Sequence, residues 1–99
     1  MTKIVYNACY GGFSVSQDVL NRYAELVGKP VEEYNVYEDF DRADPILIQV
    51  IEELGLEKSS GWCAKLRFRE LEPGTLYRIE EYDGYESVIT ADEEVWSIA

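Results

Sequence analysis

The sequence predicts a single α+β domain over residues 1–99, in the order β-α-α-β-β-β, with a mostly antiparallel sheet and two helices packed on one face. Three observations predict this class. The first residues have the two-residue period of a strand. Two later segments have helical spacing and end at glycine. Three short alternating segments then follow, separated by turn residues. A chain of 99 residues has room for one hydrophobic core.

The first strand is expected over residues 2–10, because successive side chains there divide between two faces. One face holds Ile4, Tyr6, Ala8 and Tyr10, and the other holds Lys3, Val5 and Asn7. Gly11 and Gly12 then break the strand.

The first helix follows directly. Ser14 and Gln17 have the spacing of a capping box, and apolar residues from Val15 to Val27 recur at helical intervals. Gly28 is placed to end this helix. An irregular connector, residues 31–43, comes next and is dense in acidic and aromatic residues.

The second helix is expected to begin where Asp44 caps it and Pro45 fits its first turn. Its buried stripe runs from Ile46 to Leu54, and Gly55 ends it. Residues 58–61 are expected to form a loop. Alternation then predicts strands over 63–71, 76–82 and 85–90, the last two joined by a tight hairpin turn at Asp83-Gly84.

The net charge is −11, from 20 acidic and 9 basic residues. Such a charge disfavours direct binding to nucleic acid or to anionic membranes, and it attracts basic protein surfaces. The acidity can equally serve solubility alone, and both interpretations stay open here. With no apolar run long enough for a membrane helix and too few cysteines for a disulfide framework, we expect a protein of the reducing cytoplasm.

The acidic residues are concentrated in two segments. Residues 32–44 carry a charge of −5 and residues 80–94 carry −7, so the rest of the chain stands at +1. Aromatic residues are interleaved with these acids, a composition suited to docking on a basic groove and able to imitate the phosphates of DNA. The predicted partner-binding residues are Glu33, Tyr34, Tyr37, Glu38, Asp39, Asp41, Glu81, Asp83, Glu86, Asp92, Glu93 and Glu94.

Nothing in the sequence predicts an enzyme. The absence of histidine removes the usual general base and the commonest transition-metal ligand. Cys9 and Cys63 are better explained as structural thiols than as nucleophiles. Asp39, Asp41 and Asp44 resemble half of a calcium loop, but that motif's glycine and terminal glutamate are missing. We therefore expect no catalytic residues, no metal and no cofactor.

One local feature supports a different hypothesis. A glycine pair between a strand and a helix lets the backbone turn tightly and approach a ligand, and the first turn of the helix offers N–H groups to an anion. The established phosphate-binding glycine patterns are absent. The residues of this alternative site for a nucleotide or signalling molecule are Cys9, Tyr10, Gly11, Gly12, Phe13 and Ser14.

The run from Val5 to Ser16 (VYNACYGGFSVS), the block Arg42-Ala43-Asp44-Pro45 and the block EYDGYE at residues 81–86 carry a resemblance. In order and spacing they resemble a family of small proteins from tailed phages and large DNA viruses. Where such proteins have a basic pair before a tryptophan, this chain has Asp92-Glu93-Glu94 before Trp96.

A viral origin implies an antagonist of a host system. The function we expect is that of a stoichiometric inhibitor, of the anti-CRISPR or anti-restriction kind, which acts in the host cytoplasm on a basic nucleic-acid-handling protein. The alternative is the small-ligand binder that uses the turn from Tyr10 to Ser14.

Overall fold

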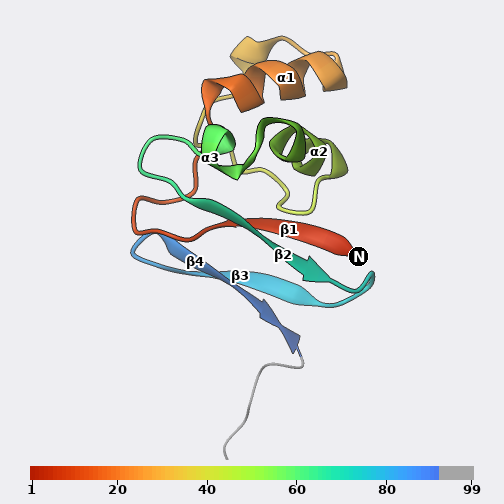
Figure 1. The fold of residues 1–99 in the computed structure, drawn as a ribbon, viewed down its shortest axis with the longest axis vertical. Coiled ribbons are helices and arrows are strands. Elements are labelled where there is room, and N and C mark those ends of the chain that lie inside the picture. Colours follow the sequence, from red (N-terminus) through yellow and green to blue (C-terminus); the bar gives the residue numbers. More distant parts are fainter. Residues whose placement is uncertain (92–99) are drawn as a thin grey trace, which may run out of the picture.

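The computed structural model describes residues 1–91 and confirms an α+β fold with antiparallel strand pairs (Figure 1). Its strands are β1 (Thr2–Asn7), β2 (Leu66–Leu71), β3 (Tyr77–Tyr82) and β4 (Tyr85–Thr90). Its helices are α1 (Gln17–Val27), α2 (Pro45–Leu54), α3 (Leu56–Ser59) and the short 3-10 helix η1 (Val31–Glu33).

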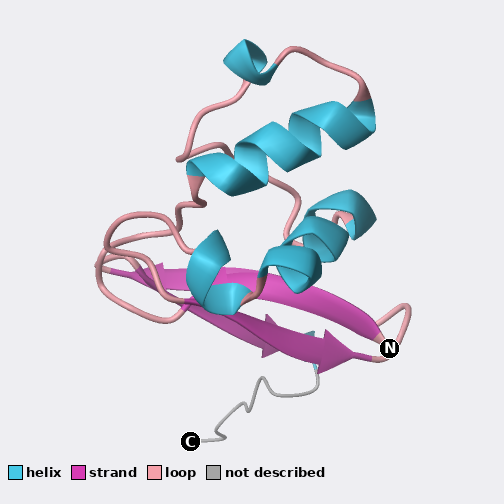
Figure 2. Cartoon of the chain, turned by 45° about the horizontal axis from the view of Figure 1, so that its top comes forward, coloured by secondary structure: helices cyan, strands magenta, loops and turns pink. Residues whose placement is uncertain are grey.

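The strands form two separate two-stranded sheets, where the sequence predicted one sheet. Strand β1 pairs with β2, from Thr2 opposite Leu71 to Asn7 opposite Leu66, and β3 pairs with β4. The helices lie on one side of the β1–β2 ribbon and the β3–β4 hairpin lies on the other (Figures 1 and 2). The expectation that both helices lie on one face of a sheet therefore holds, with a second sheet on the opposite face.

Strand β1 explains this layering, because each of its faces carries a fully buried apolar residue. Val5 joins the larger core, which α1, α2 and Leu66 complete. Ile4, on the opposite face, packs with Leu71 and Val88 in a smaller core between the two ribbons. Ile4 and Val5 are each at most 1% exposed, so neither face of the strand is left to solvent. The free edge of β1 is covered as well, since the Val5 N–H donates to the Arg42 carbonyl at 3.0 Å.

The structure confirms the predicted cap of α2 and corrects the predicted cap of α1. Asp44 accepts a hydrogen bond from the Ile46 N–H at 2.9 Å and caps α2 as predicted, with Pro45 in the first turn. Ser14 is not the cap of α1. Ser16 takes that place and accepts from the Val19 N–H, while Ser14 is buried beside the loop at residues 61–62. Part of the segment predicted as a loop at 58–61 instead belongs to α3.

No helix among residues 1–91 combines the length and the apolar character needed to span a membrane.

Candidate functional site

Three loops meet at one end of the two ribbons: residues 8–13, 61–65 and 83–84. The buried side chain of Asn7 connects them. Its amide nitrogen donates to the carbonyls of Cys9 (2.7 Å) and Gly84 (2.9 Å), and its amide oxygen accepts from the Lys65 N–H (2.8 Å). Both donors of this amide and one acceptor position of its oxygen thus hold main-chain atoms of three loops together, and the oxygen also accepts from the Cys9 thiol at 3.4 Å.

The glycines of this end allow those loops to touch. A side chain at Gly11 would overlap the carbonyl group of Cys63, and one at Gly84 would overlap main-chain atoms of Tyr10 and Gly12. The proposed ligand turn is therefore closely packed against the chain itself. Ser14 is buried, its hydroxyl donates to the Trp62 carbonyl at 3.5 Å, and its own carbonyl accepts from the Gly61 N–H at 3.1 Å. The turn offers no open phosphate cradle, and no geometry here favours the small-ligand alternative.

A partly buried ion pair between Arg42 and Glu86 lies beneath this end, and the ring of Phe13 packs against the Arg42 guanidinium. The guanidinium of Arg42 donates two hydrogen bonds to the carboxylate of Glu86, one of them at 2.9 Å. Its central carbon lies 3.5 Å from the centre of the Phe13 ring. Glu86 also accepts from the Asn7 N–H at 2.9 Å. The side chains of Arg42 and Glu86 are only 14% and 8% exposed.

Glu86 therefore has to be withdrawn from the predicted partner-binding residues, because its carboxylate is turned inward and satisfied within the chain. The tight-hairpin register explains this placement. On β4, Glu86, Val88 and Thr90 face the β1–β2 ribbon and are buried, while Tyr85 and Ser87 face away and are exposed.

A pocket of about 510 Å³ opens on the outer side of the hairpin. Its walls carry three tyrosines, two glutamates and a serine, namely Tyr10, Tyr82, Tyr85, Glu80, Glu81 and Ser87. We call these six residues the tyrosine pocket. Tyr10 and Tyr85 are in ring contact, with centroids 5.4 Å apart. Tyr10, Tyr82 and Tyr85 are 66%, 78% and 39% exposed, which is unusual for such large rings.

The two carboxylates of the tyrosine pocket are only lightly engaged. Glu80 forms an exposed ion pair with Arg78 at 2.7 Å. Glu81 accepts from the Gly84 N–H at 3.1 Å, and within residues 1–91 no basic side chain pairs with it. Because exposed ion pairs are weak, the Glu80 carboxylate is available to an incoming cation, whereas Glu81 lies opposite Glu86 in the strand register and points to the other face of the hairpin.

Only part of this site is predictable from the sequence. Glu81 belonged to the predicted partner surface and Tyr10 to the alternative ligand site, while Glu80, Tyr82, Tyr85 and Ser87 were not selected. The signal was present in the Asp83-Gly84 turn, since a two-residue turn makes Tyr82 and Tyr85 direct neighbours across the strands. No signal placed Tyr10 beside them, because that contact depends on how two loops pack.

The connector uses its predicted partner-binding residues differently. Tyr34 packs its ring against Tyr23 and Phe40, with centroids 5.4 and 6.3 Å away. Glu38 accepts from the amide groups of Asn35, and Asp41 accepts from the Ala43 N–H. The remaining members, Glu33, Tyr37 and Asp39, are exposed. Asp83, at the tip of the hairpin, is exposed too, whereas Asp92, Glu93 and Glu94 lie outside the described residues.

The two acidic segments meet where the connector passes the hairpin. The ion pair between Arg42 and Glu86 joins them. Burial, followed by the negative charge of Asp41 nearby, raises the pKa of Tyr77 on β3 above its ordinary value. The contact is confined to the inner side of the hairpin, so the tyrosine pocket belongs to the hairpin and the residue 8–13 loop.

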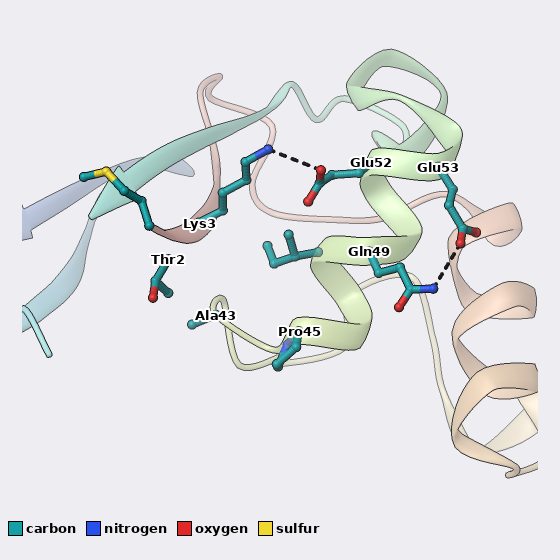
Figure 3. Close-up of a pocket in the computed structure, with 9 residues that line it drawn as sticks. Thr2, Lys3, Ala43, Pro45, Gln49, Glu52 and Glu53 are labelled. Atoms are coloured by element: carbon teal, nitrogen blue, oxygen red, sulfur yellow. Dashed lines mark hydrogen bonds and ion pairs between the residues drawn. The ribbon is translucent and has the colours of Figure 1, made fainter. Parts of the chain in front are cut away.

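A second pocket, of about 560 Å³, lies between the start of β1 and helix α2 (Figure 3). Ala43, Pro45 and Ile48 supply its apolar wall. Its carboxylates are already paired, Glu52 with Lys3 at 3.3 Å and Glu53 with Arg22 at 3.2 Å. Those pairs leave this pocket without the unbalanced charge that distinguishes the tyrosine pocket.

The described residues assemble no group of three side chains able to hold a metal ion. Cys9 donates its thiol hydrogen to the Cys63 carbonyl at 2.7 Å and sits within the loop packing. Cys63 is exposed, with its backbone in the left-handed conformation at φ 65°.

Comparison of the chain with protein-family models, with curated proteins and with solved structures finds no match.

Proposed function

We propose that this chain is a binding protein that docks on a basic surface of another protein through the tyrosine pocket. One observation carries the proposal: three exposed tyrosine rings gather beside the Glu80 carboxylate at a single end of the molecule. Tyrosine is among the residues that contribute most to binding when an interface covers it. The carboxylates add steering, because an acidic protein is drawn to a basic patch over distances comparable to the Debye length.

The partner class follows from charge. A surface basic enough to attract a protein of net charge −11 is typical of proteins that bind nucleic acid. Together with the resemblance to phage and large-virus proteins, this supports a stoichiometric inhibitor that occupies the nucleic-acid-binding surface of a host defence protein. In that role the chain competes with the phosphate backbone and performs no chemistry of its own.

The test is affinity capture from a bacterial lysate with two matched double variants. Glu80→Lys with Tyr82→Ala removes one ring and reverses one charge in the tyrosine pocket. Glu33→Lys with Tyr37→Ala makes the same change in the connector, at two exposed residues. We expect wild type and the connector variant to retain the same nucleic-acid-binding protein, and the pocket variant to lose it.

Salt and DNA complete the test. The retained protein should be released by high salt and by added double-stranded DNA, because both compete for its basic surface. Retention by the pocket variant, or release by neither competitor, would overturn the proposal. Loss in the connector variant alone would move the binding surface to residues 33–41.

A further inference from the structure

We infer that the tyrosine pocket receives the guanidinium group of a single arginine from the partner, held against the tyrosine rings and paired with Glu80. The inference rests on the proposed function and names the chemical group that the docking surface recognises.

The shape of the site suits a flat cation. Tyr82 and Tyr85 are direct partners across the hairpin turn, and Tyr10 reaches Tyr85 from the neighbouring loop, at 5.4 Å between ring centres. On the same outer face, Glu80 pairs in register with Ser87. A cation that enters here meets the electron-rich faces of aromatic rings together with carboxylate oxygens, the two groups that arginine recognises best.

The inner side of the same hairpin already holds one arginine in this way. There Arg42 lies 3.5 Å from the centre of the Phe13 ring, which comes from the residue 8–13 loop, and donates two hydrogen bonds to the carboxylate of Glu86 on β4. On the outer side the same loop and hairpin supply the same two components, the ring of Tyr10 from the loop and the carboxylate of Glu80 from β3.

Arginine fits better than lysine for a geometric reason. The planar guanidinium stacks on a ring and still presents a fork of N–H donors to a carboxylate in its own plane. A lysine ammonium is a compact, strongly hydrated charge that gains less from a half-exposed aromatic wall.

Arg78 is the internal competitor for this position. Its guanidinium pairs with Glu80 at 2.7 Å, and the two side chains are 55% and 54% exposed. An incoming arginine has to share or displace that pair, which is weak because water screens it. Replacing Arg78 with glutamine removes a positive charge from the site, so we expect Arg78→Gln to strengthen binding about threefold.

The probe is a capped peptide, Gly-Ser-Gly-Arg-Gly-Ser-Gly, titrated into the isotope-labelled full chain by two-dimensional amide NMR. Matched peptides carry lysine or citrulline at the central position. We expect the arginine peptide to shift the amide signals of residues 10, 80–82, 85 and 87, the lysine peptide to bind more weakly, and the uncharged citrulline peptide to leave them in place.

Variants then test each component. Tyr82→Ala, and separately Glu80→Gln, should each weaken binding of the arginine peptide about tenfold. Tyr37→Ala, an exposed tyrosine of the connector, should have no effect, and the dispersion of each amide spectrum reports whether the variant is folded.

Absence of shifts at the pocket, or equal shifts with citrulline, would overturn the arginine inference while leaving protein capture intact. Arginine binding at the pocket without any captured protein would overturn the proposed function and keep the inference. The two failures are therefore distinguishable.

Discussion

The connector at residues 31–43 and the hairpin at residues 77–90 are both rich in carboxylates and aromatic rings, and both carry a net negative charge. They use their rings differently. The connector packs Tyr34 and Phe40 into the fold and leaves Tyr37 as a single exposed ring. The hairpin leaves Tyr82 and Tyr85 side by side on the surface, next to Glu80.

The connector's use of its side chains is structural. Phe40 and Tyr34 pack around Tyr23 of α1, with the Phe40 ring centre 5.0 Å from that of Tyr23. Asp44 caps α2 and also accepts a hydrogen bond of 2.6 Å from the Tyr23 hydroxyl. An acidic, aromatic stretch is thus not an interface by composition alone. The number of rings packed within the chain decides how many aromatic side chains each segment has left for a partner.

The largest expected effect comes from removing the ion pair that joins the connector to the hairpin. Arg42→Ala leaves the buried Glu86 carboxylate without its counter-charge, and we expect a loss of about 3–5 kcal/mol in the free energy of unfolding. Urea denaturation measures it. The matched control is Arg78→Ala, which breaks an exposed pair on the outer side of the same hairpin and should cost at most about 1 kcal/mol. Similar small losses in both variants would mean that the inner pair does not organise the fold.

Removing one aromatic ring from each segment sharpens the comparison. Phe40 is 7% exposed, and Phe40→Ala should lower the free energy of unfolding by about 3 kcal/mol, because it leaves a cavity between α1 and the connector. Tyr82 is 78% exposed, and Tyr82→Ala should stay within about 0.5 kcal/mol of wild type. Urea denaturation of both variants checks this, and a large loss for Tyr82→Ala would place that ring in the fold rather than in the binding surface.

A smaller effect appears at alkaline pH. Burial, and then the hydrogen bond and negative charge of Asp44, raise the pKa of Tyr23 well above its ordinary value. The unfolded chain releases this proton near pH 10 while the folded chain still holds it, so the stability that Tyr23 contributes is complete below about pH 10 and falls as the pH rises further. The slope for this one group approaches about 1.4 kcal/mol per pH unit.

Urea denaturation over this alkaline range measures the slope. Tyr23→Phe is the control. It should lose about 1 kcal/mol at neutral pH with the hydrogen bond and show a shallower alkaline decline. The pKa of Tyr77 is also raised, so Tyr77 lowers the stability at alkaline pH in the same direction, and some decline should persist in Tyr23→Phe. If the alkaline decline in the free energy of unfolding has the same slope in Tyr23→Phe as in wild type, Tyr23 is not the group that causes it.

Local signals predicted the elements of the fold well. The caps and stops at Asp44, Gly28 and Gly55 and the turn at Asp83-Gly84 act within a few residues of chain, so sequence alone locates them. The division into two sheets was not predictable in this way. The alternation of β1 is that of a half-exposed strand, and only the packing of the hairpin beneath it buries both Ile4 and Val5.

The site divides along the same line. The acid-rich hairpin and its tyrosines can be identified in the sequence, but the six-residue pocket cannot, because Tyr10 lies at least seventy positions along the chain from the other five residues. The prediction that Glu86 binds a partner was wrong for a related reason. Its inward direction follows from strand parity, but its burial depends on Arg42 arriving from the connector.

The amide of Asn7 has a consequence for protein engineering. It fixes three loops mainly through main-chain atoms, at Cys9, Lys65 and Gly84. The outward side chains of those loops, such as Tyr10 and the 85% exposed Trp62, take no part in that attachment. These outward positions can therefore be randomised as a library while the three loops stay fixed to one another.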